Sequence, residues 1–160
     1  MSDDDVLMAE ARKFEKNLLN FFWRQGVSSV EGEDLVQETY LRLWKYRRDY
    51  RPTAKLSTFL FLLARQVRID ALRRQTRRTN REEDWGKDRP TVLQPDFGVR
   101  EDVRWAVSRL SDPLRETVEL GVFQDLPYAE VAAILGVPVG TVKSRMSNAL
   151  KKLKEIFDES

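Results

Sequence analysis

Two short helical segments meet at a tight turn within residues 126–145, and this feature constrains the fold more than any other. Gly136 permits a sharp reversal of the chain, and Pro138 suits the first turn of the next helix, where its missing N–H costs nothing. The second segment carries an apolar stripe at helical spacing, made by Val142, Met146, Ala149 or Leu150, and Leu153. This pattern predicts a helix-turn-helix.

The other face of the second segment is basic and rich in small side chains. Its members follow helical spacing and are Gly140, Lys143, Ser144, Ser147, Asn148 and Lys151. Lys143 could donate to guanine acceptors and Asn148 could pair with an adenine edge in the major groove of DNA. Thr141 and Arg145 lie beside this face and suit phosphates. The segment therefore predicts DNA contact, and the alternative is a helical hairpin with an exposed basic side.

Helical periodicity runs through almost the whole chain, without convincing strand alternation. It predicts helices over residues 6–24, 32–48 and 58–78, with Ser57 as the cap of the third. A polar stretch with Gly and Pro follows, and then helices over residues 99–109 and 113–123 precede the helix-turn-helix. We therefore expect an all-α fold of two small helical domains, residues 1–79 and 98–160, joined by a flexible linker over residues 80–97.

The amino-acid composition excludes several classes of function. The chain has neither Cys nor His, which excludes disulfides, thiolate nucleophiles, imidazole bases and the usual zinc sites. It also lacks a Gly-rich phosphate loop, so we expect no enzyme activity, no metal and no cofactor. Net charge is only +2, but residues 65–81 and 139–154 are strongly basic, which predicts two polyanion contacts.

No apolar run reaches the ~18 residues that span a bilayer, and the acidic start lacks the layout of a signal peptide. We therefore expect a cytoplasmic protein without membrane insertion.

Two surfaces in the N-terminal half are candidates for binding. Asp34, Gln37, Glu38 and Leu41 share one helix face, which suits a protein partner with basic residues, although a plain amphipathic helix is the alternative. A second face holds Gln66, Asp70, Arg73, Arg74 and Arg77, near the aromatic residues Trp44, Tyr46, Tyr50, Phe59 and Phe61. Aromatic rings beside Arg can stack extruded bases, and Tyr50, in a predicted loop, is the best candidate because most of the others should be core.

Three segments resemble bacterial RNA polymerase sigma factors. Residues 33–44 resemble their polymerase-docking helix, residues 57–74 their promoter-melting helix, and residues 138–145 their recognition helix for the −35 element. The segments occur in the family's order, and a short chain with only these two domains resembles the extracytoplasmic-function (ECF) group.

The resemblance implies three sets of contact residues. Core polymerase would bind Asp34, Leu35, Gln37, Glu38 and Leu41. The melted −10 element would bind Tyr50, Lys55, Ser57, Thr58, Gln66, Asp70, Arg73 and Arg74, with a flipped base captured in the loop over residues 46–57. The double-stranded −35 element would bind Thr141, Lys143, Ser144, Arg145, Ser147, Asn148 and Lys151. The family also implies an anti-sigma factor as a partner.

The sequence departs from the family at three of these positions. Gln66 stands where Asn is common, and Ser147 and Asn148 stand where many members carry Arg or another bulky residue, so we expect altered base preference. Two other functions compete with a sigma factor. The first is a stand-alone helix-turn-helix regulator, which would give residues 34–44 no function. The second is a sigma-like decoy that binds no DNA, and the basic recognition face argues against it.

Overall fold

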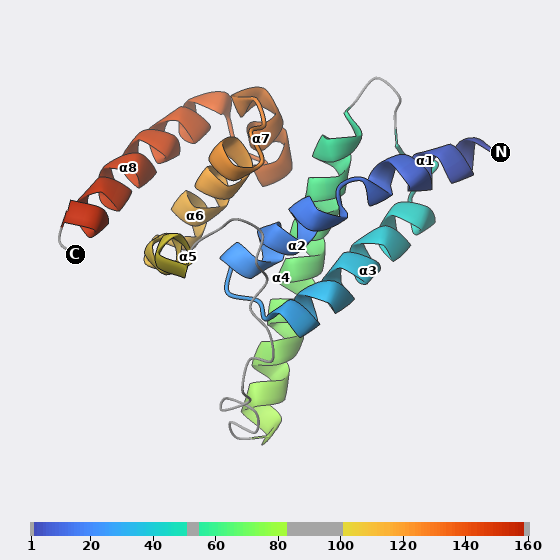
Figure 1. Ribbon diagram of the computed structural model, residues 1–160, viewed down its shortest axis with the longest axis horizontal. Coiled ribbons are helices and arrows are strands. Elements are labelled where there is room, and N and C mark those ends of the chain that lie inside the picture. The colour runs from blue at the N-terminus through green and yellow to red at the C-terminus, as the bar shows by residue number, and fades with distance from the viewer. Residues whose placement is uncertain (1, 51–54, 83–100, 159–160) are drawn as a thin grey trace. The chain divides into compact units, whose positions relative to one another are not determined.

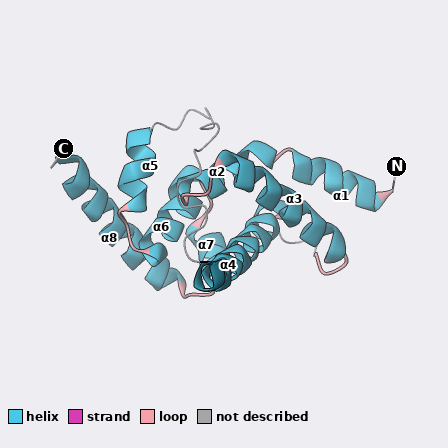
Figure 2. Ribbon diagram, turned by 90° about the horizontal axis from the view of Figure 1, so that it is seen from below, coloured by secondary structure: helices cyan, strands magenta, loops and turns pink. Residues whose placement is uncertain are grey.

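The computed structural model describes residues 2–50, 55–82 and 101–158, the side chains of residues 78–82 excepted. All regular elements in this part of the chain are helices, which confirms the all-α prediction (Figure 2). They form two compact units (Figure 1). The first unit contains the described residues up to Phe22 and those from Ser28 to Glu82, and the second contains Trp23–Val27 and the described residues from Glu101 onward.

The first unit begins with two helices where the sequence predicted one. Helix α1 (Asp3–Arg12) starts at a capping box, in which the Ser2 hydroxyl accepts a hydrogen bond from the Asp5 N–H at 3.2 Å. It ends at Lys13, and α2 (Glu15–Arg24) follows. The Phe14 N–H donates to the Ala11 carbonyl at 3.0 Å, which tightens the chain between the two helices. The prediction was wrong here because neither Gly nor Pro marks the break.

Helices α3 (Ser29–Lys45) and α4 (Leu56–Glu82) make the most extensive contact in the first unit. Ser28 caps α3 by accepting a hydrogen bond from the Glu31 N–H at 3.2 Å. Their buried side chains are Leu35, Val36, Tyr40, Leu43, Leu60, Phe61, Leu63, Ala64 and Val67. Ser57 lies inside the first turn of α4, so its predicted capping role is wrong.

Helix α4 also continues three residues past the domain boundary predicted at residue 79. Residues 83–97 of the predicted linker lie outside the described part of the chain.

The second unit contains α5 (Glu101–Ser108), α6 (Asp112–Val118), α7 (Tyr128–Leu135) and α8 (Val139–Asp158). The helix predicted over residues 113–123 changes at its end into a π-helical turn, η1 (Glu119–Phe123). Leu110, Val118, Met146 and Ala149 form a buried cluster, which Leu114, Phe123 and Leu153 border. This cluster joins α6 to α8 and therefore fixes which face of α8 is buried.

The predicted turn between the last two helices is present. Gly136 ends α7 with φ +68, a left-handed conformation that favours glycine. Pro138 immediately precedes α8 rather than occupying its first helical position, and its carbonyl accepts a hydrogen bond from the Val142 N–H at 3.2 Å. The structure thus contains the helix-turn-helix that the sequence predicted.

A buried ion pair lies beside η1 in the second unit. Arg24 Nε donates to Glu119 Oε2 at 2.6 Å, and Gln124 Nε2 donates to the other Glu119 oxygen at 3.3 Å. The Arg24 guanidinium also lies 4.3 Å from the centroid of the Phe123 ring. Burial raises the pKa of Glu119 to about 7, although the hydrogen bond from Arg24 acts in the opposite direction. The ionisation of Glu119 should therefore respond to pH near neutrality.

Candidate nucleic-acid interface

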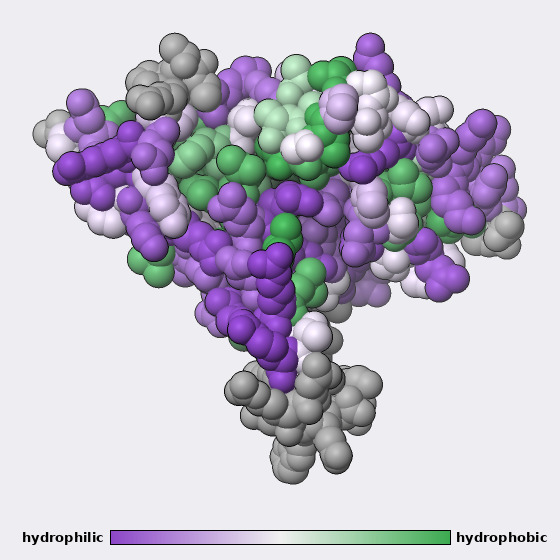
Figure 3. All heavy atoms as spheres, turned by 180° about the vertical axis from the view of Figure 1, so that it is seen from behind, coloured by the Kyte–Doolittle hydropathy of each residue, from purple (hydrophilic) through white to green (hydrophobic). Residues whose placement is uncertain are grey.

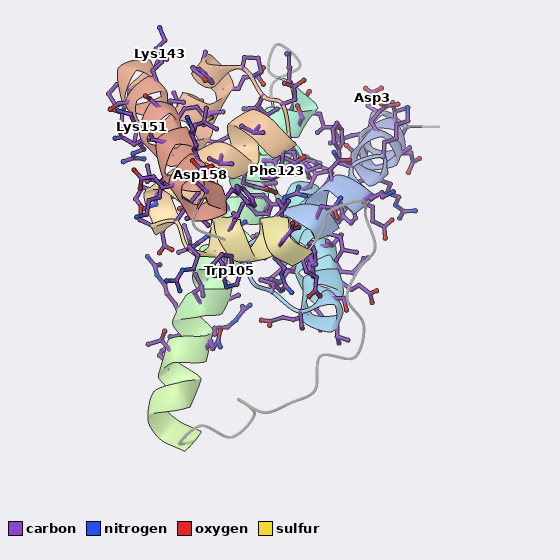
Figure 4. The ribbon with its side chains drawn as sticks, turned by 60° about the vertical axis from the view of Figure 1, so that its left-hand side comes forward. Asp3, Trp105, Phe123, Lys143, Lys151 and Asp158 are labelled. Carbon is purple, nitrogen blue, oxygen red and sulfur yellow. The ribbon has the colours of Figure 1, made fainter. Side chains whose placement is uncertain are left out.

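The polar face of α8 is exposed along its length, as predicted. Gly140, Lys143, Ser144, Ser147, Asn148 and Lys151 are all exposed. Lys143 and Lys151 project outward from the helix (Figure 4). The opposite side is buried through Val142, Met146 and Ala149, whereas Leu150 is 50% exposed, so Ala149 completes the apolar stripe. Thr141 and Arg145 are half-buried beside the polar face.

Helix α7 supports this face from behind, because Val131, Ala132 and Ile134 are buried and α7 packs against α8. Within the described residues, neither Lys143 nor Lys151 takes part in an ion pair, whereas Lys152 lies 3.9 Å from Glu155. Two lysines are therefore available as point charges, among small polar side chains that let the helix approach a groove. This arrangement can bind phosphates and reach base edges.

A second polar surface lies on α4. Hydrophilic residues gather over the part of this helix that precedes residue 78 (Figure 3). Gln66, Arg73 and Arg74 are exposed, and the Asp70 side chain is partly exposed. Asp70 accepts a charge-assisted hydrogen bond from Arg42 on α3, so its carboxylate is already engaged within the first unit.

The residues before α4 are less open than the sequence suggested. Lys55 is exposed, but Ser57 and Thr58 are half-buried, and Thr58 Oγ1 is buried without a hydrogen-bond partner among the described residues. The half-buried Tyr50 ring lies 5.6 Å from the ring of Phe59. Residues 51–54 of the predicted base-capturing loop lie outside the described part of the chain.

The polymerase-docking face predicted on α3 is partly apolar and partly acidic. Asp34 and Gln37 are exposed, and Leu41 is 69% exposed. Glu38 is only half-exposed because it contacts two arginines. Leu35 is 4% exposed and belongs to the core between α3 and α4, so it supports this face from beneath, and its contact with polymerase stays a prediction.

Sequence reasoning missed Arg42, which connects the two candidate surfaces of the first unit. Its Nη2 atom lies 3.0 Å from Glu38 Oε1 and 2.8 Å from Asp70 Oδ2, and Arg74 Nη2 lies 3.3 Å from Glu38 Oε2. Burial would lower the pKa of Arg42, but hydrogen bonds to Asp70 and Glu38 outweigh it and raise the pKa. The available sequence signal was the i, i+4 spacing of Glu38 and Arg42.

In the described part of the chain, no group of three or more Cys, His, Asp and Glu residues is placed to hold a metal ion. None of the helices in the same residues is both long and apolar enough to cross a membrane.

Both units match known families. Residues 11–78 match Sigma-70 region 2, and residues 100–153 match Sigma-70, region 4. The chain is 28% identical over 157 residues to the ECF RNA polymerase sigma factor RpoE of Cereibacter sphaeroides, covering 95% of this chain and 87% of that protein. It is 31% identical over 137 residues to the ECF RNA polymerase sigma factor SigK of Mycobacterium bovis, covering 80% of this chain and 73% of that protein.

Two solved structures share the fold. The sigma factor RpoE of Bartonella quintana, in complex with the anti-sigma factor NepR, has a TM-score of 0.73 at 24% identity, with 96% of this chain and 92% of that chain covered. CnrH in complex with the cytosolic domain of CnrY has a TM-score of 0.71 at 20% identity, with 99% of both chains covered. A region 2 unit followed by a region 4 helix-turn-helix defines a Sigma-70 type factor. The chain belongs to the ECF RNA polymerase sigma factors, and it acts in transcription initiation.

Proposed function

We propose that this sigma factor docks on core polymerase through α3 and holds the promoter at two places, one on α4 and one on α8. The observation that carries the proposal is the continuous exposed face of α8, from Gly140 to Lys151, within a region 4 helix-turn-helix. A helix with this face can enter the major groove of the −35 element. Lys143 would donate to base acceptors or phosphates, and Arg145 would contact the backbone beside it.

The −10 element would bind α4 as a melted strand. Arg73 has a side chain that is 74% exposed and Gln66 is exposed, which supports contacts with phosphates and with a base respectively. Because Tyr50 is half-buried against Phe59, we propose that it borders the captured base instead of carrying it alone. Asp70 acts in this proposal through Arg42 and not as a direct DNA contact.

The docking surface would combine Leu41 with the acidic and amide side chains of Asp34, Gln37 and Glu38. An apolar side chain that is 69% exposed favours a protein partner, and the acids favour one with basic residues. We further propose an anti-sigma factor as a regulatory partner. The structural neighbour RpoE was solved with the anti-sigma factor NepR, and CnrH was solved with the cytosolic domain of CnrY. The factor would act in the cytoplasm as a binding protein without enzyme activity of its own.

Run-off transcription with purified core polymerase tests this function. A promoter library is transcribed with and without the protein, and we expect a subset of promoters to be active only when the protein is present. If no transcript depends on the protein, the proposal fails. In that case, operator binding without polymerase would indicate a stand-alone regulator, and binding of neither polymerase nor DNA would indicate a decoy.

A further inference from the structure

An ion cluster in the first unit joins Glu38, which the proposed function assigns to polymerase, to Arg74 on the helix proposed to bind the melted strand. The cluster consists of Glu38 and Arg42 on α3 and Asp70 and Arg74 on α4. Glu38 is shared between two cations, because its Oε1 lies 3.0 Å from Arg42 Nη2 and its Oε2 lies 3.3 Å from Arg74 Nη2. The Glu38 carboxylate therefore contacts one arginine on its own helix, α3, and one arginine on α4.

The two contacts of Glu38 differ in strength and exposure. Arg42 is 21% exposed and is anchored by its second hydrogen bond, 2.8 Å to Asp70 Oδ2. Arg74 is 53% exposed, and its contact with Glu38 is the longer of the two. A long ion pair in solvent is weak, so it exchanges readily with another partner. Arg42 thus positions Glu38, while the more exposed Arg74 contacts the other Glu38 oxygen at the longer distance.

We propose that Glu38, positioned by Arg42, is an internal counterion that keeps Arg74 from the phosphates of single-stranded DNA until polymerase docks on α3. The inference rests on the proposed function, because it requires α3 to bind polymerase and α4 to bind the strand.

Charge complementarity would allow a basic side chain of polymerase to replace Arg74 as the partner of Glu38. The acids on α3 favour a polymerase segment that carries a basic side chain, and that side chain would replace Arg74 at Glu38 Oε2. The Arg74 guanidinium then becomes available for a phosphate of the melted strand. Linkage makes the effect reciprocal, since a strand bound at Arg74 leaves Glu38 free for polymerase. Docking and strand capture would therefore strengthen each other.

The test uses the full chain without polymerase and measures its affinity for a fluorescein-labelled single-stranded DNA oligonucleotide of mixed sequence by fluorescence anisotropy. Glu38→Gln should tighten binding by about two- to fivefold, the range expected for one exposed ion pair. Asp34→Asn is the matched control, because it removes the same charge from α3 one turn earlier, and its effect should be smaller. Thermal unfolding checks that each variant is folded.

A double substitution tests the route through Arg74. In an Arg74→Gln background, Glu38→Gln should affect oligonucleotide binding no more than Asp34→Asn does. Equal effects of Glu38→Gln and Asp34→Asn in the wild-type background would overturn the proposal. An effect of Glu38→Gln that persists without Arg74 would also overturn it.

Arg73→Gln separates this inference from the proposed function. Arg73 is exposed on α4 and makes no contact with Glu38, so its loss should weaken oligonucleotide binding if α4 is the strand surface. If Arg73→Gln has no effect, the strand surface is wrong and the counterion role fails with it. If Arg73→Gln weakens binding while Glu38→Gln equals Asp34→Asn, only the counterion role fails.

Discussion

Arg42 Nη2 lies 2.8 Å from Asp70 Oδ2, and this hydrogen bond joins α3 to α4 in the first unit. Arg42 would otherwise be an ordinary surface residue of the docking helix, and Asp70 an unfavourable anion on a surface proposed to bind phosphates. The contact neutralises Asp70 and leaves the arginines near it less constrained. A residue of α3 thereby sets the electrostatics of α4.

Arg42→Gln should weaken the binding of single-stranded DNA. Asp70 would lose its partner on α3 and attract Arg73, now 4.0 Å away, and Arg74, which lies one helical turn after Asp70. We expect a two- to fivefold loss of affinity, roughly that of an exposed ion pair, measured by anisotropy. Lys45→Gln, which removes one charge from the same helix, is the control, and an equal loss in that variant would refute this role of Arg42.

Leu41→Asp should weaken the binding of core polymerase by at least about tenfold, because burial of a leucine in an interface contributes more than the ~1.4 kcal/mol that a tenfold change represents. Its side chain is 69% exposed, so the free energy of unfolding should change by less than about 0.5 kcal/mol. Val6→Asp, at an exposed aliphatic position on α1, should leave polymerase affinity unchanged. Sedimentation with core polymerase measures both variants. Unaltered binding of Leu41→Asp would remove α3 as the docking face.

Gly136→Ala should destabilise the second unit by about 1 kcal/mol or more, because an L side chain at φ +68 is strained. Gly140→Ala is the control, since Gly140 lies in α8 with open space around the position of a Cβ atom. Alanine there should be neutral or stabilising by a few tenths of a kcal/mol. Urea unfolding distinguishes the two, and equal effects would contradict the requirement for a left-handed turn.

Glu119→Gln should flatten the pH dependence of stability. The pKa of Glu119 is raised from 4.5 to about 7, so its contribution is fully present below pH 4.5 and is lost as the pH rises through 7. A shift of that size corresponds to on the order of 3 kcal/mol. The wild type should therefore lose stability relative to the variant between pH 4.5 and 8, as measured by denaturant unfolding. Parallel pH profiles would contradict a raised pKa.

Periodicity was sufficient to predict α8. The positions of Val142 and Met146 determine which side of an isolated helix is apolar, so the exposure of Lys143 and Lys151 followed from spacing alone. Leu35 was assigned from the resemblance and not from the face on which it lies, so its burial was not anticipated.

Other features depend on contacts between distant residues. Glu38 and Arg42 are four residues apart, but their connection to Asp70 exists only because α3 packs on α4. The π-helical turn begins at Glu119, whose buried side chain is hydrogen-bonded to Arg24, 95 residues earlier in the sequence. No local pattern carries that information, so the prediction of a plain helix there was incomplete.

The central claim is that α8 and α4 hold two separate promoter elements, and promoter-library transcription with sequencing of the products tests it most directly. The double variant Lys143→Ala and Lys151→Ala is compared with wild type and with Lys152→Ala. Lys152 lies about two and a half helical turns after Lys143, and therefore about 180° around α8 from it. We predict that the double variant loses sequence preference in the upstream element and keeps it in the element next to the start site. A changed downstream preference with an intact upstream one, or a loss equal to that of Lys152→Ala, would contradict the account.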